Sequence, residues 1–361
     1  MSIAIQPHAE AADEAVELLR KAGLANPVRL VKLIRDTISF FELNLTDITV
    51  LTEAASGPYV VTPVIAALAG AQRVIAVTRD SPFATVNEVI AQTRAFEILC
   101  GVSNAVEIHA RRTPDLFAEA DIVTNLGFVR PIDAEAVAAM RQTAVVSLMC
   151  EAWEFRPGDV DLEACRARGI PIVATNEDFP GLEVFDYSGW LCLKMLFEVQ
   201  IEIHKSKIIV ISTDKFGRVI ERQLTKAGAT ATMTASLKDT MDIDLAAVDA
   251  LVIADYTRSD WIIGPDGDMT ADMIAKINPS AVIIQFAGCI DVPGLQRNGI
   301  LVYPASQLTP HRMAHTLAWL GPRPVVELHT AGLKAATSLK RMSKQEIASD
   351  SKYDDLTQLV S

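Results

Sequence analysis

The segment CEAWEFR at 150–156 brings two carboxylates and an indole within five positions. It follows an apolar run at 144–149, so we expect it to be the loop at the end of a buried strand. Two carboxylates this close repel an anionic substrate and can raise each other's pKa, which suits acid–base chemistry. We take Glu151 and Glu154 as candidate catalytic residues and Trp153 as a candidate substrate contact. A substrate here would carry an amine, hydroxyls or a sugar face; the alternative is a solvated loop balanced by a neighbouring arginine.

Polar residues also follow two neighbouring apolar runs. Asn125 and Arg130 lie in TNLGFVRPID, and Asn176 and Glu177 follow the run IPIVAT. Open parallel sheets bind ligands outside the carboxyl ends of their strands, so we predict that these four residues contact substrate. The alternative is that they only form the turns.

Two histidines, His311 and His315, are spaced so that they share one face of a helix. Such a pair can bind a metal, but no third ligand is evident nearby, so no metal site is predicted. The five cysteines are an odd number without a CxxC motif, which argues against a disulfide framework or a thiolate zinc site.

The elements that must position these residues alternate between apolar strands and helices, which indicates parallel sheets with right-handed crossovers. The sequence therefore predicts an α/β fold with two Rossmann-like lobes and an N-terminal helical extension. Helices are expected at 8–22, 26–43, 84–101, 183–203 and about 310–320. Strands are expected at 47–51, 73–77, 105–110, 122–125, 144–149, 172–174, 207–211, 229–233, 250–253, 281–284 and 301–303.

Three regions follow from this pattern. Residues 1–190 are expected to form a substrate-type domain that includes the extension 1–45, and 205–318 a dinucleotide-binding-like domain. The segment 319–361 should pack back on the first domain through a short extended stretch, because VVEL at 325–328 is too apolar for a free tail. The polar residues from Ser343 onward are expected to be loosely ordered.

The formal net charge of −12 argues against nucleic acid and anionic membrane surfaces as partners. The N-terminus has no basic region followed by an apolar run, and no apolar stretch is long enough to cross a bilayer. We therefore expect a cytoplasmic protein whose partner is a small-molecule substrate.

From about 120 to 320, the chain resembles the D-2-hydroxyacid dehydrogenases of the formate/glycerate dehydrogenase superfamily. The resemblance rests on the order and spacing of several segments. These are DVDLEACRARGIPIVATNE, EVFDYSGWLCLKML, KIIVISTDKFGRVIERQLTKAGA, INPSAVIIQFAGCID and LTPHRMAHTL. It implies a dinucleotide domain that binds NAD or NADP, and it implies that His311, in the Thr-Pro-His motif, is the catalytic acid or base.

The cofactor fingerprint departs from that family. Its Gly-x-Gly-x-x-Gly is replaced here by Ser212, Thr213, Asp214, Lys215, Phe216 and Gly217, so only the last glycine remains. The second strand ends at Thr234 without an acid for the adenosine ribose, and Ala287 stands where the family has a catalytic arginine.

Asp214 places a carboxylate where backbone should approach a pyrophosphate, and it can cap the helix that begins at Lys215. Lys215 is the cation that could offset this charge. We therefore expect weak or absent NAD binding.

Three functions remain open. The first is an NAD(P)-dependent oxidoreductase acting on a small polar metabolite in a cleft between the domains, with His311 moving the proton. The second is a non-redox, ligand-binding member that no longer uses the cofactor. The third is a transferase with an adenosyl cofactor bound in the N-terminal βα unit, where one glycine, Gly57, stands in the first loop. By analogy with the family, and because of the apolar helix at 183–203, a homodimer is expected.

Overall fold

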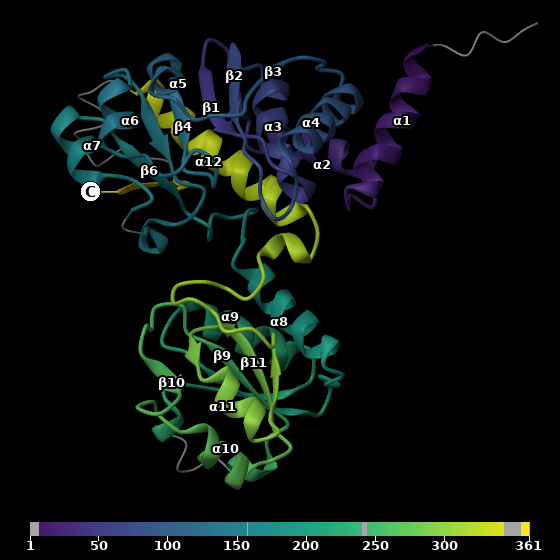
Figure 1. Cartoon of the computed structure of the whole chain (residues 1–361), viewed down its shortest axis with the longest axis vertical. Helices are drawn as coiled ribbons and strands as arrows, with labels where there is room; N and C mark the ends of the chain where they lie inside the picture. Colours follow the sequence, from purple (N-terminus) through teal and green to yellow (C-terminus); the bar gives the residue numbers. More distant parts are fainter. Residues whose placement is uncertain (1–6, 157, 240–243, 343–354, 361) are drawn as a thin grey trace, which may run out of the picture. The chain divides into compact units, whose positions relative to one another are not determined.

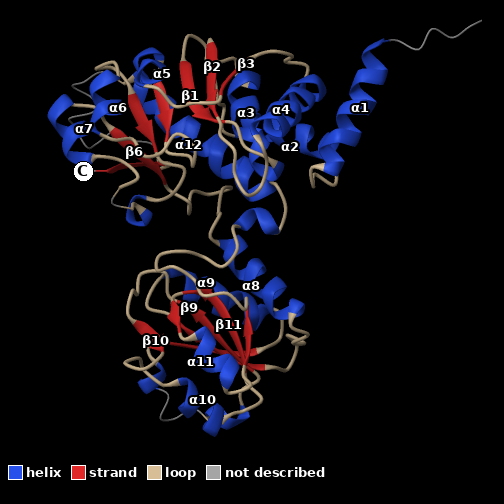
Figure 2. Cartoon of the chain, viewed as in Figure 1, coloured by secondary structure: helices blue, strands red, loops and turns tan. Residues whose placement is uncertain are grey.

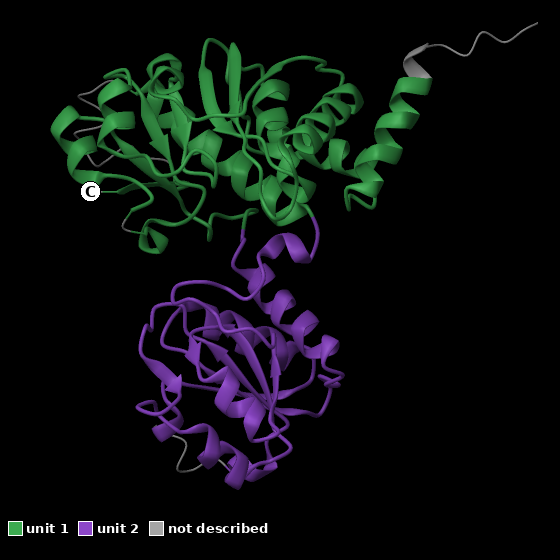
Figure 3. Cartoon of the chain, in the orientation of Figure 1, with its two compact units in different colours: residues 1–182, 322–361 green, residues 183–321 purple. Residues whose placement is uncertain are grey.

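The computed structural model describes residues 7–156, 158–239, 244–342 and 355–360. It contains two compact units, shown in Figure 3. Unit 1 comprises Met1–Leu182 and Pro322–Ser361, and unit 2 comprises Glu183–Gly321. Each unit has its own mainly parallel sheet (Figure 2), which confirms the α/β class predicted from the sequence.

Unit 1 is built on a seven-stranded sheet in the order β14-β6-β5-β4-β1-β2-β3. All neighbours are parallel except β14, which pairs antiparallel with β6. The chain order reverses between β1 and β4, so this is the doubly wound arrangement with one added strand. Its strands are β1 (Thr49–Glu53), β2 (Arg73–Val77), β3 (Val106–His109), β4 (Ile122–Thr124), β5 (Val145–Ser147), β6 (Ile172–Thr175) and β14 (Thr357–Val360).

Helices cover both faces of this sheet, which explains why its central strands are almost continuously apolar. One face packs Leu51, Val123 and Val146 against α5–α7. The opposite face packs on α3 and α12. The helices of unit 1 are α1 (Pro7–Lys21), α2 (Pro27–Phe40), α3 (Val61–Leu68), α4 (Val86–Cys100), α5 (Pro114–Glu119), α6 (Ala134–Ala139), α7 (Leu162–Arg168) and α12 (Arg323–Arg341), with short 3-10 turns η1 (Gly57–Val60) and η2 (Ala152–Glu154).

The helix α12 corrects one expectation, because the extended stretch predicted near residue 325 is helical. A buried stripe at Val326, Thr330, Leu333 and Thr337 recurs at helical spacing and is wide enough to hold the helix on the sheet. In Figure 1 this helix, coloured yellow-green, runs across unit 1, and it contacts β5, β6, α2 and α3. The sequence pattern was too short near 325 to distinguish strand from helix.

The C-terminal residues correct a second expectation. The segment 343–354 lies outside the described residues, but Thr357–Val360 form the strand β14 rather than a loose tail. Pairing with the exposed edge of β6 supplies this short polar segment with backbone hydrogen bonds that its own sequence does not reveal.

Unit 2 contains a five-stranded parallel sheet in the order β13-β11-β9-β7-β8 and a separate pair, β10-β12. Its strands are β7 (Lys207–Ile211), β8 (Thr230–Thr234), β9 (Ala250–Ala254), β10 (Trp261–Ile263), β11 (Val282–Ala287), β12 (Cys289–Ile290) and β13 (Leu301–Tyr303). Its helices are α8 (Asp186–Glu198), α9 (Lys215–Lys226), α10 (Ala271–Ile277) and α11 (Val292–Arg297), with 3-10 turns η3 (Leu237–Asp239), η4 (Leu245–Ala247) and η5 (Leu317–Trp319).

The helix predicted at about 310–320 is absent from the described structure, which has only η5 (Leu317–Trp319) there. His311 adopts a φ of 58°, in the left-handed region, which ends any helical path that begins near Pro310. The helix expected to join the two lobes is α8, and it packs against α9 within unit 2.

Candidate functional site

The carboxyl edge of the unit 1 sheet gathers most of the predicted substrate residues. The strands β4, β5 and β6 are parallel neighbours, so the loops that follow them lie at one edge. Asn125 directly follows β4, Glu151 lies in the loop after β5, and Glu177 lies just after β6. The sequence prediction that these side chains share an edge therefore rests on a sheet that the structure contains.

Glu151 is buried, and its carboxylate holds two loops together. Its Oε1 accepts a hydrogen bond from the backbone N–H of Glu177 at 3.0 Å, and its Oε2 accepts one from the indole of Trp153. Its own backbone N–H donates to Oε1 of Glu154 at 3.2 Å, which closes the 3-10 turn η2 as a capping box. Glu151 thus fixes where both Glu154 and Trp153 lie.

Glu154 has the strongest chemical potential of this group. Burial raises its pKa to about 7, although the N–H of Glu151 stabilises the charged form. The negative charge of Glu151 adds to the increase, while Arg156 and a hydrogen bond with the Glu177 side chain oppose it. A carboxyl group with a pKa near neutrality both accepts and donates protons at physiological pH, which suits a general acid or base.

Trp153 and Asn125 lie beside this pair in different roles. Trp153 is 40% exposed, and because Glu151 holds its indole N–H, its ring presents a fixed aromatic surface. Asn125 is buried, and its side-chain oxygen accepts the N–H of Met149 at 2.9 Å, which ties the β4 loop to the β5 loop. Burial also raises the pKa of the Cys150 thiol, with the charges of Glu154 and Glu177 adding to it.

Arg130 and Asn176 face other partners. Arg130 pairs with Asp159, and Asn176 donates from Nδ2 to the backbone oxygen of Asp355 at 2.7 Å. Asn176 therefore holds the C-terminal strand, and its contacts give no sign of a ligand site.

Sequence reasoning missed Glu53, a second buried carboxylate at this edge. It ends β1, where the chain order of the sheet reverses, and its Oε2 accepts the N–H of Phe128 at 3.1 Å. Burial raises the pKa of Glu53, while the N–H groups of Phe128 and Gly127 and the charge of Arg130 oppose the increase. A charged residue closing the apolar run TVLTE was the available signal.

In unit 2, Asp214 occupies the loop where the cofactor fingerprint was expected. It is the N-cap of α9: its Oδ1 accepts the N–H of Phe216 at 2.9 Å and the hydroxyl of Ser212 at 3.1 Å. Its Oδ2 accepts the N–H of Tyr256, after β9, at 2.6 Å. Burial, together with the nearby charge of Asp255, raises the pKa of Asp214.

Asp255, which the sequence analysis also missed, completes a reciprocal clasp. Its Oδ2 accepts the backbone N–H of Thr213 at 2.8 Å and the Thr213 hydroxyl at 2.7 Å. The loops after β7 and β9 are therefore joined by two carboxylates at the point where the strand order of this sheet reverses. In doubly wound sheets, that point is where backbone N–H groups receive a dinucleotide pyrophosphate. Here those groups already have acceptors.

The remaining fingerprint residues have structural contacts. Phe216 is buried and packs against the rings of Phe185, Tyr256 and Phe286. Lys215 has its Nζ 3.9 Å from the centroid of the Phe185 ring. The hydroxyl of Thr234 donates to the backbone oxygen of Ser236 at 3.1 Å.

Gly217 is the one fingerprint glycine that remains, and the packing requires it. A β-carbon at this position would lie 2.3 Å from Cβ of Ser212 and 3.1 Å from Sδ of Met233. We expect Gly217→Ala to destabilise the protein by about 1–3 kcal/mol, measured by urea unfolding. Adding Ser212→Gly should recover part of that loss. If Gly217→Ala unfolds at the wild-type urea concentration, α9 does not pack as closely as described.

His311 lies at the clasp, on the loop that follows β13. Its side chain is exposed, and Nδ1 lies 2.9 Å from the backbone oxygen of Tyr256, the residue whose N–H is bound by Asp214. His315 instead stacks on Trp319, with ring centroids 4.1 Å apart. Among the residues that the structure describes, no three His, Cys, Asp or Glu side chains form a group able to hold a metal ion.

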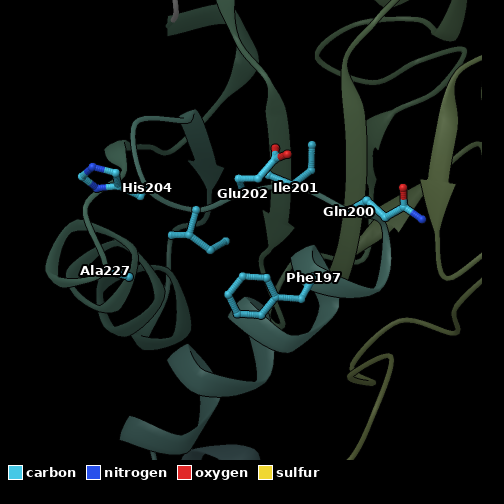
Figure 4. A pocket seen from close by; sticks show the side chains of 7 residues that line it. Phe197, Gln200, Ile201, Glu202, His204 and Ala227 are labelled. Carbon is cyan, nitrogen blue, oxygen red and sulfur yellow. The ribbon is translucent and has the colours of Figure 1, made fainter.

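A hollow of about 530 Å³ lies elsewhere in unit 2 (Figure 4). Phe197, Ile201 and His204 line it, in the chain that leads from α8 into β7. It therefore lies at the amino edge of the sheet, whereas Asp214 and Asp255 lie at the carboxyl edge. None of the helices within the described ranges is long and apolar enough to cross a membrane.

No protein-family model matches the chain, and no curated protein matches it. Among solved structures, a dipicolinate synthase from Bacillus halodurans is similar with 12% identity and a TM-score of 0.51, covering 83% of this chain and 100% of that one. The dipicolinate synthase from Bacillus subtilis has 10% identity and a TM-score of 0.52 over 83% and 99% of the two chains. An NAD-dependent formate dehydrogenase from Staphylococcus aureus in complex with NAD has 9% identity and a TM-score of 0.38 over 80% and 99%. At these identities the similarity to dipicolinate synthase shows a shared fold.

Proposed function

We propose that the chain is an enzyme that binds a small metabolite with an amine or hydroxyl groups at the carboxyl edge of unit 1. Glu154 transfers a proton to or from that metabolite. The observation that carries this proposal is the hydrogen-bonded carboxyl pair of Glu154 and Glu177, in which the pKa of Glu154 is raised to about 7.

The neighbouring residues have separate roles in this proposal. Glu177 shares the proton with Glu154, and Trp153 supplies the apolar surface on which a sugar face or alkyl chain packs. Glu151, first considered a catalytic residue, is better assigned as a positioning residue because its two carboxylate oxygens hold Trp153 and the Glu177 N–H. Asn125 serves in the same way by joining two loops.

Three sugars of matched size test the chemical preference of the site. Glucosamine carries an amine, glucose only hydroxyls, and glucuronate a carboxylate. We expect the first two to stabilise the protein in thermal unfolding and the third to have no effect, because the acidic edge repels it. Stabilisation by glucuronate alone would contradict the proposal, and Glu154→Gln should narrow the difference between amine and acid.

The second candidate is an NAD(P)-dependent oxidoreductase in which His311 is the acid or base. The fold shared with dipicolinate synthase and the close packing at Gly217 favour it. The clasp of Asp214 and Asp255 opposes the usual binding mode, because a pyrophosphate would compete with two carboxylates for the same N–H groups.

We expect wild-type protein to bind NADH and NADPH weakly, and Asp214→Gly to bind them about ten- to hundredfold more tightly in calorimetry. The substitution frees the Tyr256 and Phe216 N–H groups and removes a like charge. Asp291→Gly, which removes the N-cap of α11 instead, is the matched control. Tight wild-type binding that Asp214→Gly weakens would mean that Asp214 belongs to the cofactor site.

S-adenosylmethionine belongs in the same titration, as the probe for a third candidate, an adenosyl-cofactor transferase. The N–H of Gly57 donates to Gln92 at 3.0 Å, and Asp80 accepts the N–H of Val86 at 2.8 Å. These groups of the first βα unit therefore already have partners, so we expect no binding.

We also propose that the protein is a cytoplasmic homodimer. The exposed aromatic side chains of α8, Trp190 at 52% and Phe197 at 58%, support a second chain packing there. Light scattering that reports a monomer at micromolar concentration would count against it.

A further inference from the structure

We infer that the C-terminal strand β14 positions the glutamate site, and that Gln358 is the residue through which it acts. This inference rests on the proposed function, because it assigns a role to residues outside the proton-transfer pair. The chain returns to unit 1 through α12 and ends at the edge of the same sheet whose loops carry the glutamates.

Three hydrogen bonds join this strand to the two glutamate-bearing loops. The side-chain oxygen of Gln358 accepts the N–H of Ala152 at 3.0 Å, inside η2. The backbone oxygen of Leu356 accepts the N–H of Asn176 at 2.8 Å, and that of Asp355 accepts its side-chain amide at 2.7 Å. The loop before Glu154 and the loop before Glu177 are therefore both anchored to the last described residues of the chain.

Packing places Gln358 on the face of the sheet where the site lies. In the antiparallel pair, Gln358 lies opposite Ala174 and Val360 opposite Ile172, both in the core cluster against which Ala152 and Phe155 also pack. Leu359 points to the other face because strand side chains alternate. Leu356 is only 2% exposed and anchors the start of the strand.

The charged and titratable groups that face Glu154 come from two loops. Glu151, Cys150 and Arg156 lie on its own loop, and Glu177 comes from the loop after β6. The side chain that β14 adds here is an uncharged amide. Gln358 therefore supplies a backbone acceptor next to Glu154 without adding another charge.

Two substitutions separate positioning from general stability. Gln358→Met keeps the size and removes the acceptor, so η2 loosens, water reaches Glu154, and its titration moves downward toward the ordinary range. Gln358→Glu keeps an acceptor and adds a negative charge, so the titration moves upward. We expect shifts of about half a pH unit or more, in opposite directions, in a pH titration of tryptophan fluorescence. A merely structural role would move both variants the same way.

Controls assign the signal and keep the outcomes distinct. Trp153→Phe should remove the transition, and Leu359→Ala, on the opposite face of β14, should leave its midpoint unchanged. Amide exchange at Ala152 should become faster in Gln358→Met and stay slow in Gln358→Glu, provided both are folded by circular dichroism. If both variants titrate like the wild type, the inference is overturned while the proposed function stands. If the wild type itself shows no transition near neutrality, the proposed function fails, and the inference fails with it.

Discussion

Replacing Glu154 with glutamine is expected to slow turnover by about 10²–10⁴-fold, the usual contribution of a positioned general acid or base. Glutamine keeps the size of the side chain and can still accept the N–H of Glu151, which Glu154 accepts at 3.2 Å. It cannot exchange a proton with the substrate. The loss should therefore appear in kcat, with little change in binding of the amine or hydroxyl ligand that thermal unfolding identifies.

The measurement is proton exchange between that ligand and D₂O, followed by NMR as a function of pH. Because burial raises the pKa of Glu154 to about 7, the wild-type rate should change through a midpoint near neutral pH. The variant should have no such midpoint. Glu163→Gln, an exposed glutamate on α7, is the matched control and should behave like the wild type. A Glu154→Gln variant within about threefold of the wild-type rate would exclude Glu154 as the proton carrier.

The second large effect concerns stability in acid. His329 on α12 is buried, and its Nδ1 lies 2.6 Å from the Thr62 hydroxyl on α3. Burial lowers the pKa of His329 to about 4 from its ordinary value of 6.5. The unfolded chain therefore binds a proton at a pH where the folded protein does not. Stability from this residue is present above pH 6.5 and is lost as the pH falls from there toward about 4.

We expect the wild type to lose roughly 3 kcal/mol more unfolding free energy than His329→Gln across that range. Glutamine can still bond to Thr62 but does not titrate in this range. Urea unfolding at several pH values measures the difference, and His204→Gln, which removes an exposed histidine, is the control. Parallel pH dependences for the wild type and His329→Gln would mean that His329 is accessible to protons in the folded state.

The order of the βα elements could be predicted from the sequence because buried parallel strands are short apolar runs. The runs at 73–77, 207–211 and 301–303 match β2, β7 and β13 residue for residue. Once the strands are parallel, their carboxyl ends share an edge, so grouping Asn125, Glu151 and Glu177 also followed from the sequence. The capping role of Asp214 followed in the same way, from an acid placed directly before a helix.

What could not be predicted depends on partners distant in the sequence. β14 is a strand because β6 offers an unpaired edge, and its own residues, TQLV, are too few to reveal that. Asp255 matters because it meets Thr213 across 42 positions of chain. The raised pKa of Glu154 likewise requires Glu177, which the fold brings from the next strand.

A pH titration of the Glu154 carboxyl carbon by ¹³C NMR decides whether this residue can carry the proton at neutral pH. The resonance is assigned by its absence in Glu154→Gln. We expect a midpoint at about pH 7, caused by burial beside Glu151 and Glu177. A midpoint close to 4.5, the ordinary value for a glutamate, would show that Glu154 is a solvated side chain and would contradict the proposed proton transfer.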